Sequence, residues 1–133
     1  METHIVSIVV AVAITITTRE EMLFLNEHPE ERSKPMHARV ATVQYQPGKM
    51  DEGIQLYRES MLPETRQQRG FKGAMGLVDR STGKSILITL WQTEADAQAS
   101  GTSSAYLQAH IAKFASLWAA APVFETYEVA LQE

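Results

Sequence analysis

The spacing of apolar residues changes repeatedly after Met36, and the order of these changes constrains the fold more than any other feature of the chain. Alternation with a period of about two residues indicates a strand, whereas apolar residues three or four apart indicate an amphipathic helix. The segments predicted on this basis are a strand at 38–46, a helix at 49–68, strands at 71–80 and 85–92, a helical region from 93 to 120 broken at Gly101, and a strand at 123–131.

Turn-forming residues separate these segments. Gly70 is well placed to terminate the first helix, and residues 81–84 form a tight connection between two strands that should pair as a hairpin. Thr93 begins a sequence similar to a capping box, which marks a helix start. Pro63 lies inside the first helical pattern, where a proline should kink the helix or restart it.

The order β-α-β-β-α-β predicts an α+β domain with the ferredoxin-like arrangement. The handedness of its crossovers makes the sheet antiparallel and places both helices on one face. Several residues on the other face are apolar, and a monomer that exposed them would tend to associate. Two such sheets packed face to face would bury both surfaces, so we expect a homodimer of the dimeric α/β-barrel type.

Residues 1–35 form an N-terminal extension ahead of the domain at 36–133. The apolar run at 5–17 is shorter than the roughly 20 residues that a membrane-spanning helix needs. The first four residues contain no Lys or Arg, which argues against a signal peptide. Two interpretations stay open: a genuine extension, ordered or disordered, and an upstream start codon read through, with Met36 as the natural start.

Composition and charge exclude several classes of function. A chain of 133 residues fits one domain, and the lack of cysteine removes disulfides, thiolate zinc sites and cysteine nucleophiles. The formal charge of −4 provides no basic surface for nucleic acid or an anionic membrane. We therefore expect neither nucleic acid nor a membrane as a partner, and we expect a cytoplasmic location.

Four short pieces of sequence carry a resemblance to a known family. They are Tyr45-Gln46-Pro47-Gly48, Gln68-Arg69-Gly70-Phe71-Lys72-Gly73, Leu90-Trp91-Gln92-Thr93-Glu94-Ala95-Asp96-Ala97 and Tyr106-Leu107-Gln108-Ala109-His110. With these pieces, the region 37–131 resembles the antibiotic biosynthesis monooxygenase (ABM) domain of the dimeric α/β-barrel superfamily. That family includes cofactor-free quinone-forming monooxygenases, haem-degrading enzymes and proteins with no known reaction.

The resemblance also argues against haem degradation. In the haem-degrading branch a histidine on the second helix ligates iron, and His110 stands at the matching place. That branch also uses an asparagine on the first strand and a tryptophan on the second helix, where this chain has Thr42 and Ser100. Haem binding through His110 alone stays open. Since no second ligand stands at a metal-like spacing from His110, we expect no metal and no cofactor.

The resemblance implies a cofactor-independent oxygenase that binds a planar phenol or hydroquinone between sheet and helices. A deprotonated substrate of this kind can react with O₂ when a dry pocket orients it and a base accepts its proton. His110 is the expected base, because a neutral imidazole accepts protons near neutral pH. The other expected site residues are Tyr106 and Thr42 as hydrogen-bonding partners, Trp91 as a wall, and Tyr57 and Met75 as lining.

Each of these residues also has a purely structural interpretation. His110 could be a partly buried or surface histidine bonded to a neighbour, and Trp91 could pack under the helix that follows it. Met and aromatic residues at helical spacing usually belong to the core. The alternative function is therefore a non-catalytic, small-molecule-binding or stress-linked barrel protein. Whether His110 points into a cavity or toward solvent distinguishes the two hypotheses.

Overall fold

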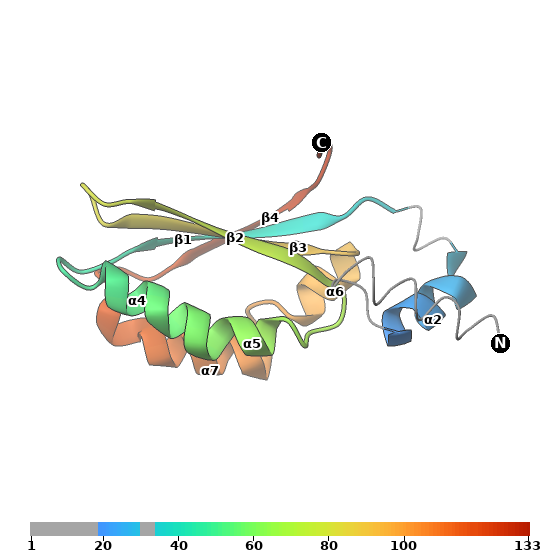
Figure 1. Ribbon diagram of the computed structural model, residues 1–133, viewed down its shortest axis with the longest axis horizontal. Helices are drawn as coiled ribbons and strands as arrows, with labels where there is room; N and C mark the ends of the chain where they lie inside the picture. Colours follow the sequence, from blue (N-terminus) through green and yellow to red (C-terminus); the bar gives the residue numbers. More distant parts are fainter. Residues whose placement is uncertain (1–18, 30–33) are drawn as a thin grey trace.

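The computed structural model describes residues 19–29 and 34–133 of the chain. One antiparallel sheet lies at its centre, with the strand order β2-β3-β1-β4. The strands are β1 (His37–Gln44), β2 (Phe71–Asp79), β3 (Lys84–Trp91) and β4 (Val123–Glu128). All helices of the domain lie on one face of this sheet (Figure 1). The structure thus confirms the predicted α+β class, with strand ends that differ from the prediction by at most a few residues.

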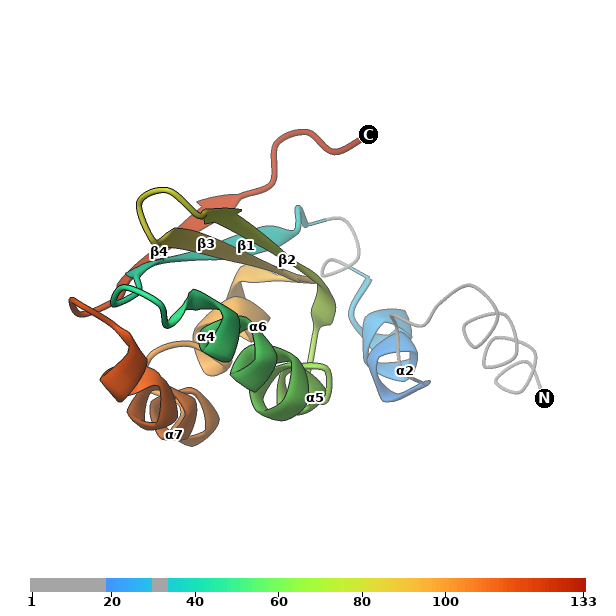
Figure 2. The same ribbon diagram turned by 60° about the vertical axis from the view of Figure 1, so that its left-hand side comes forward.

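The helical layer consists of α4 (Met50–Leu56), η1 (Tyr57–Met61), α5 (Leu62–Thr65), α6 (Glu94–Ala99), α7 (Ala105–Phe114) and η2 (Ala115–Leu117). Figure 2 shows α7 running beside α4 and α5 under the sheet. The hydroxyl of Thr93 caps α6 by accepting from the backbone N–H of Asp96, 3.1 Å away. Within residues 19–29 and 34–133, no helix is both long and apolar enough to cross a membrane.

The first helix contains a π-helical turn, η1, just before Pro63. The backbone N–H of Leu62 bonds to the carbonyl of Tyr57, five residues earlier. Proline has no N–H to donate, and its ring crowds the preceding turn of a regular α-helix. The predicted restart therefore takes the form of a wider turn. Turns of this type are frequent at functional sites, and this one contributes Tyr57 and Met61 to the lining of a cavity.

The two faces of the sheet differ in what covers them. Side chains alternate along a strand, so Arg39, Ala41 and Val43 of β1 face the helices. Val40 and Thr42 face the other side, which no helix covers (Figure 1). Exposed apolar side chains on the β2 and β4 parts of this uncovered side are Met75, Leu77, Val123 and Tyr127. The homodimer through this face stays a prediction.

Part of the N-terminal extension contacts the domain. Residues Arg19–Glu27 form helix α2, which lies beside one end of the domain (Figure 1). Leu25 of α2 is buried, and the Arg69 guanidinium lies 3.8 Å from the centre of the Phe24 ring. The apolar run at 5–17 lies outside the described residues.

Candidate functional site

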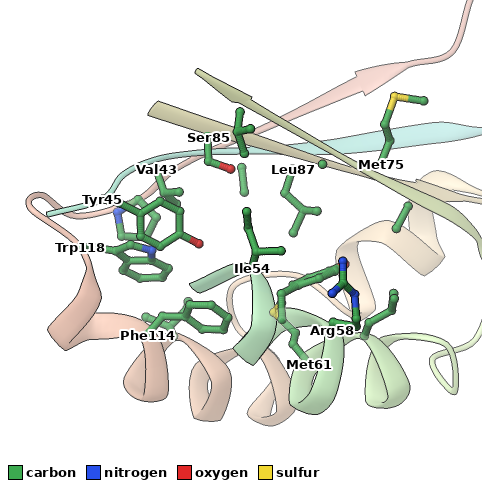
Figure 3. Close-up of a pocket in the computed structure, with 18 of the residues that line it drawn as sticks. Val43, Tyr45, Ile54, Arg58, Met61, Met75, Ser85, Leu87, Phe114 and Trp118 are labelled. Atoms are coloured by element: carbon green, nitrogen blue, oxygen red, sulfur yellow. The ribbon is translucent and has the colours of Figure 1, made fainter. Parts of the chain in front are cut away.

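A cavity of about 480 Å³ lies between the sheet and the helical layer (Figure 3). This volume falls within the range of roughly 300–1,000 Å³ that small-molecule sites occupy. The lining is mainly apolar and comes from both layers. Representative lining residues are Val43 and Leu87 from the sheet, Ile54 and Met61 from the first helix, and Phe114 and Trp118 from the second.

The cavity opens along the edge strand β2. The β2 residues that line it from the helix-covered face, Ala74, Gly76 and Val78, are all exposed. On the opposite wall, the α7 residues Leu107 and Phe114 are buried. A ligand would therefore enter beneath β2 and meet a closed apolar wall formed by α7.

Tyr57 brings a hydroxyl group to the cavity lining. Its hydroxyl oxygen is buried and, within the described part of the chain, has no hydrogen-bond partner. The pKa of Tyr57 is raised to about 12, mainly by burial and also by the nearby Tyr106, while Arg39 and Arg66 oppose the rise. Tyr57 is consequently a neutral phenol at physiological pH. A buried polar group without a partner destabilises the folded protein by about 1–3 kcal/mol. A ligand oxygen that accepted a hydrogen bond from this hydroxyl would remove that penalty.

Trp118 is a second donor in the lining. Its indole ring stacks on Phe114, with ring centres 5.5 Å apart, and its Nε1 atom is buried without an acceptor among the described residues. Burial raises the pKa of the neighbouring Tyr45, and the Trp118 N–H partly offsets this rise. The two groups are therefore close, although their geometry falls outside the limits of a hydrogen bond. Tyr57 and Trp118 thus both line the cavity, and each has a buried donor without an acceptor among the described residues.

Arg39 is a buried cation near these groups. Its Nη1 atom donates to the carbonyl of Ala97 at 2.9 Å and to the hydroxyl of Ser100 at 3.2 Å. Its guanidinium lies over the Trp91 ring, 4.9 Å from the ring centre. Burial lowers the pKa of Arg39, whereas Tyr106 and Tyr57 raise it. No carboxylate from the part of the chain that the structure describes pairs with this guanidinium.

His110 lies in the contact between two helices and is only 1% exposed. Its Nε2 atom is 3.1 Å from Oε2 of Glu64 on α5, and its ring meets the Tyr106 ring edge-on, with centres 5.9 Å apart. When the ring is neutral and Nε2–H donates to Glu64, Nδ1 is an unprotonated acceptor. Nδ1 is buried and has no partner among residues 19–29 and 34–133. His110 therefore points neither into the cavity nor into solvent.

Tyr106 and Lys113 extend this helix contact in both directions along α7. The Tyr106 hydroxyl lies 3.4 Å from Oγ1 of Thr65, which is fully buried and donates to the carbonyl of Met61. The Lys113 ammonium donates to the Ser60 hydroxyl at 3.0 Å. Polar contacts at successive turns of α7 thus fix this helix against η1 and α5.

The structure places the predicted site residues in three different environments. Tyr57 lines the cavity, and Met75 borders it through β2 while its side chain points to the uncovered face. Tyr106 and His110 lie in the helix contact beside the cavity. Trp91 is not a wall of the cavity. It is completely buried, with Nε1 donating to the Thr89 hydroxyl at 2.9 Å.

Thr42 is separated from the cavity by the sheet itself. It pairs with Ile86 of β3 and Val123 of β4, while its neighbours Ala41 and Val43 line the cavity. Because adjacent side chains on a strand point to opposite faces, Thr42 faces the uncovered side. It therefore cannot share a hydrogen bond with His110, which lies beneath the helical face.

Arg39 and Glu64 were missed by the sequence analysis. Arg39 alternates with Ala41 and Val43, but the sequence alone does not show that the helices cover this face of the first strand. Glu64 had no local signal, because its contact with His110 joins residues 46 positions apart. No cluster of three or more His, Asp or Glu side chains that could hold a metal ion occurs in the described ranges.

A sequence profile of the antibiotic biosynthesis monooxygenase family matches residues 36–112, which is more than half of the 133-residue chain. The chain belongs to the ABM family. The match covers β1 to β3 and most of α7, and so includes both walls of the cavity in this ABM domain.

Solved structures share the fold of this ABM domain. A monooxygenase of Streptomyces coelicolor in complex with nanaomycin D is 14% identical, with a TM-score of 0.64, over 75% of this chain and 91% of that one. A protein of unknown function from Nitrosomonas europaea is 19% identical, with a TM-score of 0.61, over 75% and 94%. A conserved protein of Methanosarcina mazei is 16% identical, with a TM-score of 0.61, over 73% and 95%. At these identities the likeness shows the fold.

Curated relatives match a smaller part of the chain. An uncharacterised protein of Mycobacterium tuberculosis, found in strains CDC 1551 / Oshkosh and ATCC 25618 / H37Rv, is 34% identical over 62 residues. The match covers 47% of this chain and 26% of the relative. The aligned region thus spans about a quarter of the length of these relatives.

Proposed function

We propose that this ABM domain is a cofactor-independent monooxygenase that oxidises a planar phenol or hydroquinone with O₂. One observation carries the proposal: an apolar cavity of about 480 Å³ is lined by Tyr57 and Trp118, whose buried donors have no acceptor among the described residues. A dihydroxylated aromatic ring has apolar faces and oxygen atoms at its edge. Its oxygens would satisfy the two donors, and its faces would pack against the apolar lining.

The proposed reaction is complete without an added reductant. The substrate ring loses one C–H and one O–H hydrogen as it becomes a quinone. One atom of O₂ becomes the new carbonyl oxygen, and the other leaves as water with the two hydrogens. The four electrons that reduce O₂ come from the ring. The protein would contribute a dry cavity, orientation and a route for the proton.

Two residues would stabilise the negative charge of the deprotonated substrate. Tyr57 is a neutral donor in the lining, and its hydroxyl would donate to the substrate oxygen. Arg39 is a buried cation whose charge acts on Tyr57, as the shift of the Tyr57 pKa indicates. Fixed donors and charges stabilise a developing anion most strongly where water is excluded.

We propose His110, beside Tyr106, as the proton acceptor. Tyr106 contacts the His110 ring and lies close enough to Tyr57 to raise its pKa. The carboxylate of Glu64 fixes Nε2 of His110, so the buried Nδ1 would be the atom that takes the proton. His110 does not line the cavity, and a direct transfer from substrate is not part of the proposal.

The competing function is a non-catalytic binder. The observation that favours it is the burial of His110 away from the cavity, since a binder needs the cavity and not the base. Oxygen consumption separates the two. We expect the wild type to take up O₂ with dihydroxynaphthalenes, and we expect Tyr57→Phe and His110→Gln to slow it by at least about tenfold. Tight binding without O₂ uptake would identify the binder.

We also propose that two copies associate through the uncovered face of the sheet. Met75, Leu77 and Tyr127 expose apolar surface there, and contiguous exposed apolar surface favours association. Packed face to face, the two sheets would form the barrel from which the superfamily takes its name.

A further inference from the structure

The charged residues of the cavity lining are all cationic. Arg58 and Arg80 line the cavity, and no acidic side chain does so among the described residues. This is opposite in sign to the chain as a whole, which has a formal charge of −4. The positive character is therefore local to the cavity and not a general property of the surface.

The two arginines differ in how their charges are balanced. Nη1 of Arg80 lies 2.9 Å from Oδ1 of Asp51, so an ion pair neutralises it. Arg58 makes no ion pair and no hydrogen bond with any residue that the structure describes. Arg58 thus presents an unneutralised guanidinium to a mainly apolar cavity.

Arg58 stands at the open end of the cavity. Its side chain extends from η1 toward the sheet, and Figure 3 shows Arg58 toward one end of the cavity and Tyr45 and Trp118 toward the other. Arg58 and Met75 are both exposed, whereas Tyr45 is buried. An anionic group held by Arg58 would stay in contact with water while the rest of a ligand entered the apolar interior.

We infer that the cavity recognises a planar aromatic acid, with its carboxylate held by Arg58 at the opening and its rings against the inner apolar wall. This inference rests on the proposed function, because it names the class of substrate for the same cavity. A guanidinium presents paired N–H groups that match the two oxygens of a carboxylate. A single unneutralised arginine balances one negative charge, which favours a monoanionic carboxylate.

The position of Arg58 next to Tyr57 in the π turn supports this assignment. The Tyr57 hydroxyl is buried and unpaired among the described residues, and Arg58 is the next residue along the same turn. A hydroxylated aromatic acid would meet both groups at once, with its hydroxyl at Tyr57 and its carboxylate at Arg58. Both residues line the cavity from this wider turn, which precedes Pro63.

The test compares two ligands that differ only in charge. Binding of 2-naphthoate and of neutral 2-naphthamide to the full-length protein is measured by titration calorimetry without O₂. We expect naphthoate to bind about tenfold more tightly than naphthamide, the size expected for one charge-assisted contact at a partly exposed site. Added salt should weaken the binding of naphthoate and leave that of naphthamide unchanged.

Arg58→Gln should remove the preference for naphthoate and retain the affinity for naphthamide. Arg66→Gln is the matched control, because it removes the same charge from an exposed arginine at the end of α5 that does not line the cavity. Arg58→Lys should keep part of the preference. Unfolding curves of the variants show whether each remains folded, as expected for changes at exposed positions.

Equal affinity for the two ligands, a preference that survives Arg58→Gln, or no binding of either ligand would overturn the inference. Neither probe is a dihydroxylated ring, and no O₂ is present, so these outcomes do not depend on turnover. Failure of the proposed function would be seen separately, as an absence of O₂ uptake with dihydroxynaphthalenes.

Discussion

The Nε2 atom of His110 lies 3.1 Å from Oε2 of Glu64, and this contact joins α7 to α5 across the helical layer. His110 is buried while the Glu64 side chain is 54% exposed, so a solvated carboxylate holds a buried imidazole. The contact gives His110 a structural role, and the proposed proton transfer would be an additional one.

The structural role predicts that substitutions of His110 and Glu64 lower the free energy of unfolding by different amounts. His110→Ala removes a buried ring and leaves a void, and it should lower the free energy of unfolding by about 2 kcal/mol. Glu64→Gln changes a largely exposed group and should cost less than about 1 kcal/mol. Gln108→Ala, at an exposed position of the same helix, is the control. Urea denaturation measures all three, and equal costs at His110 and Gln108 would contradict the account.

The burial of Tyr57 predicts a specific dependence of stability on pH. The pKa of Tyr57 is raised from an ordinary value of 10.0 to about 12. Between these values the unfolded chain has lost the Tyr57 proton while the folded protein keeps it, so the stability present below pH 10 falls as pH rises toward 12.

Tyr57→Phe isolates this effect from that of other titrating groups. From about pH 9 to about pH 11, the wild type should lose about 1 kcal/mol more unfolding free energy than Tyr57→Phe. Urea denaturation at both pH values measures the difference. The same pH dependence in both proteins would show that Tyr57 titrates normally.

The elements of the fold could be predicted because their signals are local. The period of the apolar residues, the cap at Thr93 and the break at Gly101 each depend on a few neighbouring residues, and all three occur in the structure. Such local signals did not predict the exact form of the turn before Pro63. A proline indicates a disturbed helix, but it does not specify a π turn.

The site was harder to predict because the sheet is apolar on both faces. Ala41 and Val43 face the helices while Val40 and Thr42 face the uncovered side, and a period of two cannot tell which set is which. Thr42 was chosen from its place in the resemblance, which does not show which face its side chain takes. The partner of His110 depends on how α7 packs against α5, which is a contact between distant parts of the chain.

The uncovered face of the sheet predicts the state of association. Ile88 of β3 pairs with Val40 on one side and Met75 on the other, near the centre of this face. The wild type should be a dimer by light scattering at micromolar concentration, and Ile88→Glu should be a monomer, because a charge would be buried without a partner. Ala112→Glu, on the exposed side of α7, should leave the dimer intact. A monomeric wild type would exclude the barrel arrangement.

The burial of His110 predicts the response to haem. An axial ligand must reach the iron, and His110 is 1% exposed with Nε2 bonded to Glu64. Titration of the protein with haem should therefore give no histidine-type Soret band that depends on His110. A band that His110→Gln abolishes would show that the helix contact opens, and haem breakdown in the presence of a reductant would contradict the proposed substrate class.

The central claim is that the cavity supports transfer of one oxygen atom from O₂ to an aromatic ring. Its most direct test is mass spectrometry of the quinone formed from 1,5-dihydroxynaphthalene, which needs one new oxygen atom to become a quinone, under isotopically heavy O₂. The reaction time is kept short enough to limit exchange of the carbonyl oxygen with water. Leu87→Trp, which fills the cavity from β3, serves as the blocked control. The account predicts one heavy oxygen atom in the quinone made by the wild type and none above background with Leu87→Trp. A quinone without the label, or equal labelling with the blocked variant, would contradict it.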